Sequence, residues 1–209
     1  MFRWRDCQEG HIIIGLTLTT ISWVLLTLTT FSTPYIKSIF FLSLPPTAAT
    51  ANTNTKFGSF GYCTTTREGC TGPQVGYLYE DEGRIGILTE WLTKTLILYG
   101  FAALFMLLAW FALILSLLKV GKFMWNPVYF RTAALLGTLS AILAEAFALV
   151  LFVQGRRRFN GVGIQAQYGA ALWLGLVGTI AAFLAAAIGG PAYQGNYMYR
   201  ADRRQAYNV

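Results

Sequence analysis

Few residues of this sequence could do chemistry, and their spacing matches no known kind of catalytic site. Such sites need a nucleophile beside a base, paired carboxylates, a cluster of metal ligands or a glycine loop that cradles phosphate. The chain has a single histidine, His11, contains no HExxH segment, and carries only one acid, Glu145, well inside an apolar run. We therefore expect no catalytic residue, no metal site, no cofactor and no small-molecule substrate, and we predict that the protein is not an enzyme.

Two cysteines, Cys63 and Cys70, lie close together in a polar segment between apolar runs. No histidine lies near them, so a zinc site would lack ligands. We predict a local disulfide instead, which would stabilise the segment by roughly 2–3 kcal/mol. Because disulfides persist in oxidising compartments, this segment is expected outside the cell. The third cysteine, Cys7, has two interpretations, a free thiol or a palmitoylated one.

Glu145 is the one acid expected to lie within a membrane span. A carboxylate in hydrocarbon costs about 2.5 kcal/mol or more, so the side chain should face protein or be protonated. One interpretation is a structural group that hydrogen-bonds a Thr, a Ser or Tyr99. Two others are a proton or ion relay and the recognition of a partner. Against a relay, no second acid, lysine or histidine lies deep in another apolar run.

Two charge clusters flank the predicted spans, the acidic run 80–82 and the arginines Arg156, Arg157 and Arg158. On the same side of the membrane they could form ion pairs, worth about 0–1 kcal/mol each when exposed. Independent solvation of the two clusters is the alternative. The acidic run lacks the spaced ligands of a calcium loop, so calcium binding is not expected there.

Four apolar runs must position these residues. Only 12% of the 209 residues are charged, about half the density of a soluble domain. Each run can cross a hydrocarbon core of about 30 Å at about 1.5 Å per helical residue, and the first is too long for a cleaved signal peptide. The net charge of +7 comes from basic residues at the run ends, which indicates membrane anchors and not a nucleic-acid-binding face. The predicted spans are residues 12–32, 94–118, 132–153 and 168–189.

The longest connection between these spans, residues 33–93, is polar and interrupted by prolines. It contains strand-like stretches at Ile36–Leu44, Phe57–Cys63 and Gln74–Tyr79. The predicted fold is an all-α membrane protein, a four-transmembrane-helix bundle with a small extracellular β-sheet. Short connections, at residues 119–131 and 154–167, make the helices antiparallel neighbours.

The distribution of basic residues does not orient the chain. Lysines and arginines divide equally, eight on each side of the membrane, whereas an excess would mark the cytoplasmic side. The orientation therefore depends on the cysteine pair. It places the N-terminal residues 1–11 and the tail, residues 190–209, in the cytoplasm, with residues 119–131 on the same side.

Small residues recur along one face of the predicted fourth span at steps of three and four. Such a seam lets a neighbouring backbone approach closely. The third span has a shorter ladder that leads toward Glu145. There are two interpretations, close contact within the bundle and docking of another protein's helix. The residues of the two seams are Gly137, Ala141, Ala171, Gly175, Gly178, Ala182, Ala185 and Gly189.

Three stretches of the long connection carry a resemblance to a known family. They are Ser32–Ile39, Phe57–Cys63 and Gly69–Tyr77, the second of which reads F-G-S-F-G-Y-C. With four spans, they resemble the fungal Sur/PalI family, distant relatives of the claudins. The resemblance implies a claudin-like fold in the plasma membrane, a left-handed four-helix bundle capped by a small extracellular sheet. The motif residues are Phe57, Gly58, Phe60, Gly61, Tyr62, Cys63, Gly76 and Tyr77.

The same resemblance implies a role without chemistry. The family includes eisosome-associated proteins linked to cortical organisation and cell-wall integrity, and PalI, an auxiliary of the ambient-pH receptor. Our leading hypothesis is a plasma-membrane organiser or accessory subunit. It would act through lateral and extracellular contacts with membrane lipids, with other membrane proteins or with further copies of itself. The alternatives are a PalI-like auxiliary of the pH-sensing complex and a small transporter or channel that uses Glu145.

Overall fold

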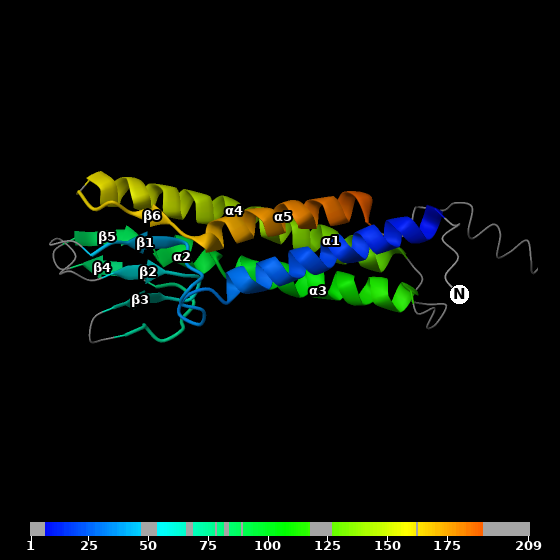
Figure 1. Ribbon diagram of the computed structural model, residues 1–209, viewed down its shortest axis with the longest axis horizontal. Coiled ribbons are helices and arrows are strands. Elements are labelled where there is room, and N and C mark those ends of the chain that lie inside the picture. Colours follow the sequence, from blue (N-terminus) through cyan, green and yellow to red (C-terminus); the bar gives the residue numbers. More distant parts are fainter. Residues whose placement is uncertain are drawn as a thin grey trace, which may run out of the picture.

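The described residues of the computed structural model form four long helices, one short helix and two small sheets (Figure 1). The description covers residues 7–46, 54–65, 69–77, 79–81, 84–88, 90–117, 127–161 and 163–189. The helices are α1 (Cys7–Thr30), α2 (Glu90–Thr95), α3 (Leu98–Leu117), α4 (Pro127–Gly161) and α5 (Ala170–Ile188). The predicted cytoplasmic tail, residues 190–209, lies outside the described residues, as do residues 1–6 of the predicted cytoplasmic N-terminus and residues 119–126 of the predicted cytoplasmic connection.

The long helices form a bundle suited to a membrane. Within the described part of the chain, four stretches are long and apolar enough to cross one, as predicted. α1 packs against α3 and α5, and α4 packs against the same two helices, so the four close into a ring. The stretches are Ile13–Thr30, Thr93–Leu115, Val128–Gly161 and Ala170–Ile188.

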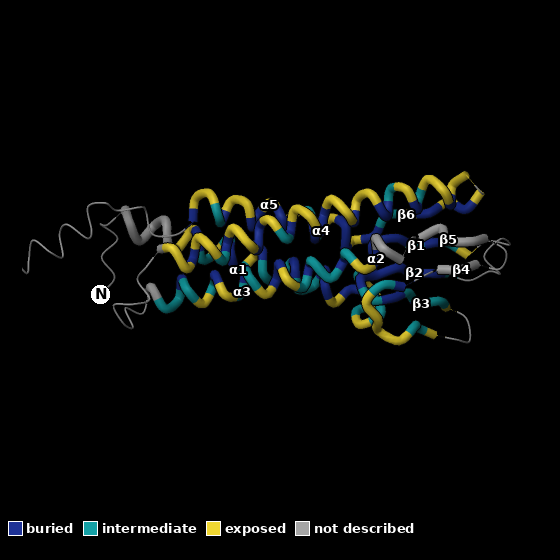
Figure 2. Tube along the Cα trace, turned by 180° about the vertical axis from the view of Figure 1, so that it is seen from behind, coloured by how far each residue is buried: buried dark blue, intermediate teal, exposed yellow. Residues whose placement is uncertain are grey.

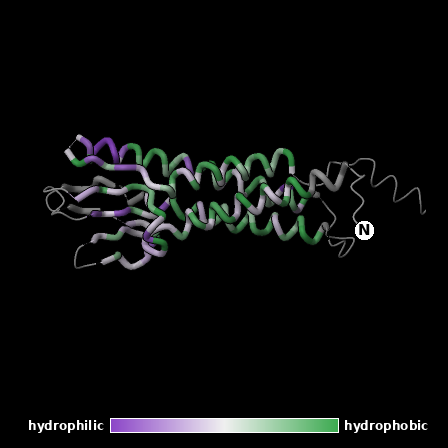
Figure 3. The backbone as a smooth tube through the Cα atoms, in the orientation of Figure 1, coloured by the Kyte–Doolittle hydropathy of each residue, from purple (hydrophilic) through white to green (hydrophobic). Residues whose placement is uncertain are grey.

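The bundle exposes many large apolar side chains and buries many small ones, together with core residues such as Leu26 and Met106. Trp173, Leu139 and Phe183 are more than half exposed, whereas Ala144 and Ala182 are fully buried. The helices are accordingly hydrophobic along most of their length, and polar residues gather at the end that bears the sheets (Figure 3). An apolar exterior of this kind is what lipid, and not water, stabilises.

The sheets form a cap at the end of the bundle opposite the start of α1 (Figure 1). The larger one is antiparallel, with strand order β3-β2-β1-β6. The smaller one is a hairpin, β4-β5. The strands are β1 (Leu42–Leu44), β2 (Thr55–Phe57), β3 (Tyr62–Thr64), β4 (Tyr79–Asp81), β5 (Arg84–Leu88) and β6 (Gln167–Tyr168).

An aromatic core joins the cap to α4. Phe41 stacks on Phe152 with ring centroids 4.7 Å apart, and Phe57 lies over Phe159 at 6.2 Å. All four rings are almost completely buried, so the dark interior continues from the bundle into the cap (Figure 2). The C-terminal part of α4, from Phe152 to Gly161, therefore supports the sheet, and we call it the post.

This post is the main departure from the sequence-based expectation. Residues 154–167 were expected to be a connection, but α4 continues through Gly161 and β6 follows. The three arginines suggested a loop. A helix that packs against a sheet on one side needs only one buried stripe, however, and its other faces can be polar. That stripe, at steps of four, three and four, is Ala148, Phe152, Gly155 and Phe159.

The strands also differ from those predicted. Phe57–Cys63 is not one strand: it forms the end of β2, a turn and the start of β3, because the Gly58 amide donates a hydrogen bond to the Gly61 carbonyl at 2.8 Å. Of Ile36–Leu44, only the last three residues pair as a strand. Residues 74–77 form no strand, and β4 begins at Tyr79.

Candidate functional site

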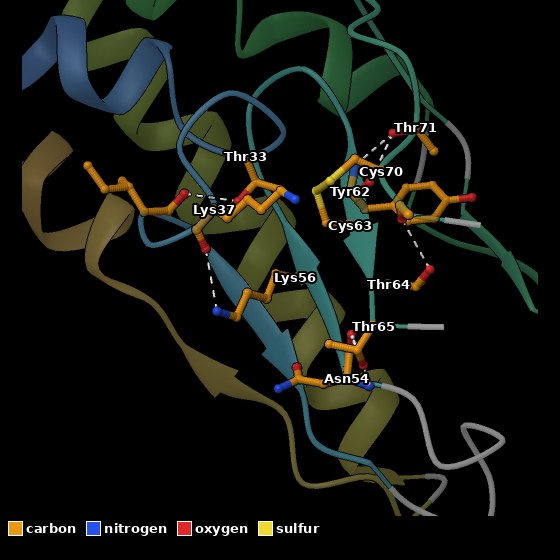
Figure 4. The surroundings of a disulfide bond; sticks show 12 residues. Thr33, Lys37, Asn54, Lys56, Tyr62, Cys63, Thr64, Thr65, Cys70 and Thr71 are labelled. Atoms are coloured by element: carbon orange, nitrogen blue, oxygen red, sulfur yellow. Dashed lines mark hydrogen bonds between the residues drawn. A yellow bond between two sulfur atoms is a disulfide. The ribbon is translucent and has the colours of Figure 1, made fainter. Parts of the chain in front are cut away.

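The predicted disulfide between Cys63 and Cys70 is present and closes the outer edge of the larger sheet (Figure 4). Cys63 lies on β3, and Cys70 forms an antiparallel bridge with it. The Thr71 amide donates to the Tyr62 carbonyl at 3.0 Å, and the Tyr62 amide donates to the Thr71 hydroxyl at 3.0 Å. The segment after Cys70 thus covers an edge that would otherwise be open to pairing.

The turn between β2 and β3 is fastened to the end of α1. The Ser59 hydroxyl donates to the Thr29 carbonyl at 2.9 Å, and the Ser59 amide donates to the Ser32 hydroxyl at 3.0 Å. At Gly58 a Cβ atom would run into the Thr33 carbonyl group. Only a residue without a side chain allows this approach, which explains the first glycine of the motif.

Tyr77 locks the same turn from the other side. Its hydroxyl donates to the Gly58 carbonyl at 2.7 Å, and its own amide donates to the Thr93 hydroxyl at 3.0 Å. Burial raises the pKa of the Tyr77 hydroxyl, so the group remains a donor. Gly76, before it, has φ +79° and lies against the Lys94 side chain, two constraints that favour glycine.

Most of the motif is therefore buried or half-buried, and the exposed segment that it supports is a different one. Phe57, Gly58 and Tyr77 are buried, and Phe60 and Tyr62 are half-buried. Residues 72–75 are exposed, and the Gln74 amide donates to the Phe60 carbonyl at 2.9 Å. We call residues 72–75 the presented loop. It is held at one end by the disulfide and the Thr71 bonds and at the other by Tyr77.

The predicted arginine cluster lies on the post. Arg156 places its guanidinium 4.5 Å from the centroid of the Tyr168 ring, which ties α4 to β6. Arg157 and Arg158 are exposed. The acidic partners considered from sequence cannot be matched to them, because Glu82 lies outside the described residues and only the backbone is described at Glu80 and Asp81.

The predicted seam on α5 is buried along its whole length and meets α1, α3 and α4. A Cβ at Gly178 would lie 3.2 Å from Leu25 and Leu26, and one at Gly189 would lie 2.9 Å from the Cα of Gly15. Gly137 faces Met106 of α3 in the same manner. The buried residues are Gly137, Ala141, Ala171, Gly175, Gly178, Ala182, Ala185 and Gly189. Contacts within the chain thus occupy both seams.

Hydroxyl groups supply polar contacts between these helices. Ser22 donates to the Gly178 carbonyl at 2.9 Å, which joins α1 to α5. Thr138 donates to the Ala182 carbonyl at 3.1 Å, which joins α4 to α5. The Trp110 indole N–H donates to the Thr20 hydroxyl at 2.9 Å, which joins α3 to α1. Such bonds are favourable inside a membrane because water does not compete for them.

Glu145 lies at the centre of three helices. The hydroxyl of Tyr99, one of the partners named from sequence, donates to its Oε2 at 2.7 Å and links α3 to α4. On α5, Gly175 makes room: a Cβ there would lie 2.7 Å from the same oxygen. The second oxygen, Oε1, is buried and has no hydrogen-bond partner among the described residues.

Sequence reasoning missed several of these residues. Ser32, Ser59 and Thr93 make the polar bonds that hold the cap on the bundle, and no motif singles them out individually. The available signal was their place beside helix ends and glycines in an otherwise apolar neighbourhood.

Among the described residues, no group of three or more His, Cys, Asp or Glu side chains could hold a metal ion.

Comparison with known proteins adds a family to this geometry. A family model described as "SUR7/PalI family" matches residues 11–185. The match covers the cap, most of each long helix and both seams except Gly189. A search among curated proteins found no match.

Proposed function

Because the chain belongs to the SUR7/PalI family, we propose that it is an organiser or accessory subunit of the plasma membrane that acts through protein contacts of its cap. Membership supports a membrane-associated, non-enzymatic role, and the fold is a claudin-like bundle with a small antiparallel sheet. The finer role, cortical organisation and cell-wall integrity, is our hypothesis. The PalI-like role in pH sensing is its closest competitor.

One observation carries the proposal: the presented loop is exposed yet held at both ends. Ordered irregular loops on rigid scaffolds are common sites of recognition, because little conformational entropy is lost on binding. Pro73, Gln74 and Val75 offer a compact surface, and Val75 is 50% exposed. The disulfide favours an oxidising compartment, so we propose that the cap faces outward and that both termini are cytoplasmic.

Copurification of the full chain in mild detergent, with and without crosslinking, tests this function. We expect a defined partner or a defined homo-oligomer, and we expect Val75→Asp to weaken the complex. Gln165→Asp is the matched control, because Gln165 is also exposed but lies beyond the end of α4. A monodisperse monomer without any copurifying protein would contradict the proposal. The identity of the partner separates cortical organisation from pH sensing.

A second candidate function, transport, has one specific observation in its favour. Glu145 is 4% exposed, and its Oε1 has no partner among the described residues, which a bound proton would help to explain. Proton or ion flux through liposomes that contain the full chain, compared with Glu145→Gln, tests this candidate. If the unmodified protein carries no flux, transport is excluded.

A further inference from the structure

A stripe of exposed, mostly apolar side chains runs along α1 toward the cap. Its exposed members recur at steps of three and four, as one face of a helix requires. The stripe ends at Phe31, directly after α1, and this end of α1 adjoins the cap (Figure 1). The stripe comprises Ile14, Thr17, Ile21, Val24 and Phe31, with half-buried Leu28 between the last two.

The stripe continues onto the cap as a row of three aromatic rings, Phe31, Tyr35 and Phe60. Phe31 and Tyr35 meet edge to face with centroids 5.6 Å apart. Tyr35 and Phe60 meet in the same manner at 6.1 Å. Tyr35 is 56% exposed, and Phe60, on the turn between β2 and β3, is half-buried. The row therefore has an open side, continuous with the side of α1 that faces lipid.

Other helices place exposed aromatic residues at the same end of the bundle. Phe101 lies in the first turn of α3, and Trp173 lies in the first turn of α5. They are 48% and 59% exposed. Aromatic side chains gather where hydrocarbon meets headgroups, because one part of the ring is apolar and its edge or polar atom tolerates water. These residues mark the level of that boundary.

A lysine follows the row closely in sequence. Lys37 is exposed two residues after Tyr35, and its carbonyl accepts a hydrogen bond from the Lys56 ammonium at 3.4 Å (Figure 4). Lysines at this level extend their ammonium groups toward lipid phosphates. The ring row and this exposed lysine together offer the apolar and the cationic contacts that a membrane surface takes.

We infer that Phe31, Tyr35 and Phe60 form a lipid contact on which the cap rests, with Tyr35 at the boundary between acyl chains and phospholipid headgroups. Lipid fits better than a protein partner because the row continues the lipid-facing stripe of α1 without a break. The contact goes beyond the proposed function. It fixes the height of the cap and leaves the presented loop, not the ring row, for protein partners.

Site-directed spin labelling of the full chain tests the contact. In a Cys7→Ser background, nitroxides are attached at Tyr35→Cys and, with all three rings kept, at Lys37→Cys. The protein is reconstituted into phosphatidylcholine–phosphatidylglycerol vesicles. The ratio of collisions with oxygen to collisions with a water-soluble nickel chelate rises with depth. We expect a ratio severalfold higher at residue 35 than in water, with residue 37 slightly nearer the aqueous phase.

Two labelled references calibrate this experiment. Ile21→Cys reports the hydrocarbon, because Ile21 lies mid-helix in the stripe, and Gln165→Cys reports water. A ratio at residue 35 between the two supports the lipid contact. A ratio equal to that of residue 165 would overturn it. A label at residues 35 and 37 that is immobile and shielded from both relaxants would also overturn it, in favour of a protein partner.

Discussion

The bundle and the cap are stabilised by different means. In the bundle, backbones approach at glycines and alanines, and the polar contacts between helices are single hydroxyl bonds such as Ser22 to the Gly178 carbonyl. In the cap, a disulfide, a network of backbone bonds and stacked aromatic rings act together. The two regions meet where Ser59 bonds to the end of α1.

The difference follows from the solvents. Lipid offers no hydrophobic driving force between helices, so close van der Waals contact must hold them, and each contact is small. The cap faces water with sheets of two to five residues per strand, too short to be stable alone. It therefore depends on cross-links and on the apolar surface of α4. We expect substitutions in the cap to cost more, residue for residue, than substitutions in the bundle.

The largest expected effect is at the joint between the two regions. In Gly58→Ala, the new Cβ would overlap the Thr33 carbonyl, and backbone cannot give way as a side chain can. We expect a loss of about 3 kcal/mol, measured as a lower midpoint of thermal unfolding in detergent and faster proteolysis of the cap. Gly72→Ala is the matched control, because nothing lies within 4 Å of its Cβ position. Equal effects of the two substitutions would contradict the docking role of Gly58.

Removal of the disulfide should destabilise the cap and leave the bundle intact. We expect Cys63→Ser with Cys70→Ser to destabilise the cap by about 2.5 kcal/mol, the chain-entropy value for so short a loop. Protease should then cut near the presented loop, while the four spans stay inserted and protected. A reductant applied to the unmodified protein should reproduce the pattern. Unchanged proteolysis in both experiments would show that the hydrogen bonds and the aromatic core hold the cap without the disulfide.

Substitutions at the buried Glu145 and its partner Tyr99 test how much one polar contact contributes to the stability of the bundle. Tyr99→Phe leaves both oxygens of Glu145 without a partner, and we expect a loss of about 1–2 kcal/mol in thermal stability. In Glu145→Gln the amide oxygen still accepts the Tyr99 hydroxyl, so the loss should be smaller. A greater loss in Glu145→Gln than in Tyr99→Phe would mean that the carboxylate, and not the hydrogen bond, is required there.

How much of each region could be predicted from sequence also differs. The four spans, the disulfide and the family follow from apolar length, cysteine spacing and the motif around Phe57–Cys63. These are local signals. The seam on α5 was visible because helical period and residue size are both local, and the Tyr99 partner of Glu145 could be named because few polar groups lie in the spans.

The cap resisted prediction because its order is not local. The sequence around Phe159 does not indicate that α4 continues and supports β2. Nor does it indicate that Gln167 and Tyr168 pair with β1, more than 120 residues away along the chain. Most motif residues help to close the core of the cap through contacts between segments far apart along the chain: Phe57 lies over Phe159, and Gly58 lies against the Thr33 carbonyl group.

The smallest expected effect is a single hydroxyl bond in the bundle. Ser22→Ala removes the donor to the Gly178 carbonyl, and we expect a loss of about 0.6 kcal/mol, the typical value for such bonds between membrane helices. Thr17→Ala is the control: its hydroxyl bonds to the Ile14 carbonyl of the same helix and faces lipid, so thermal stability should not change. If Ser22→Ala lowers the free energy of unfolding as much as loss of the disulfide does, substitutions in the cap would not cost more than substitutions in the bundle. One polar bond would then contribute more than the close contact of α1 with α5.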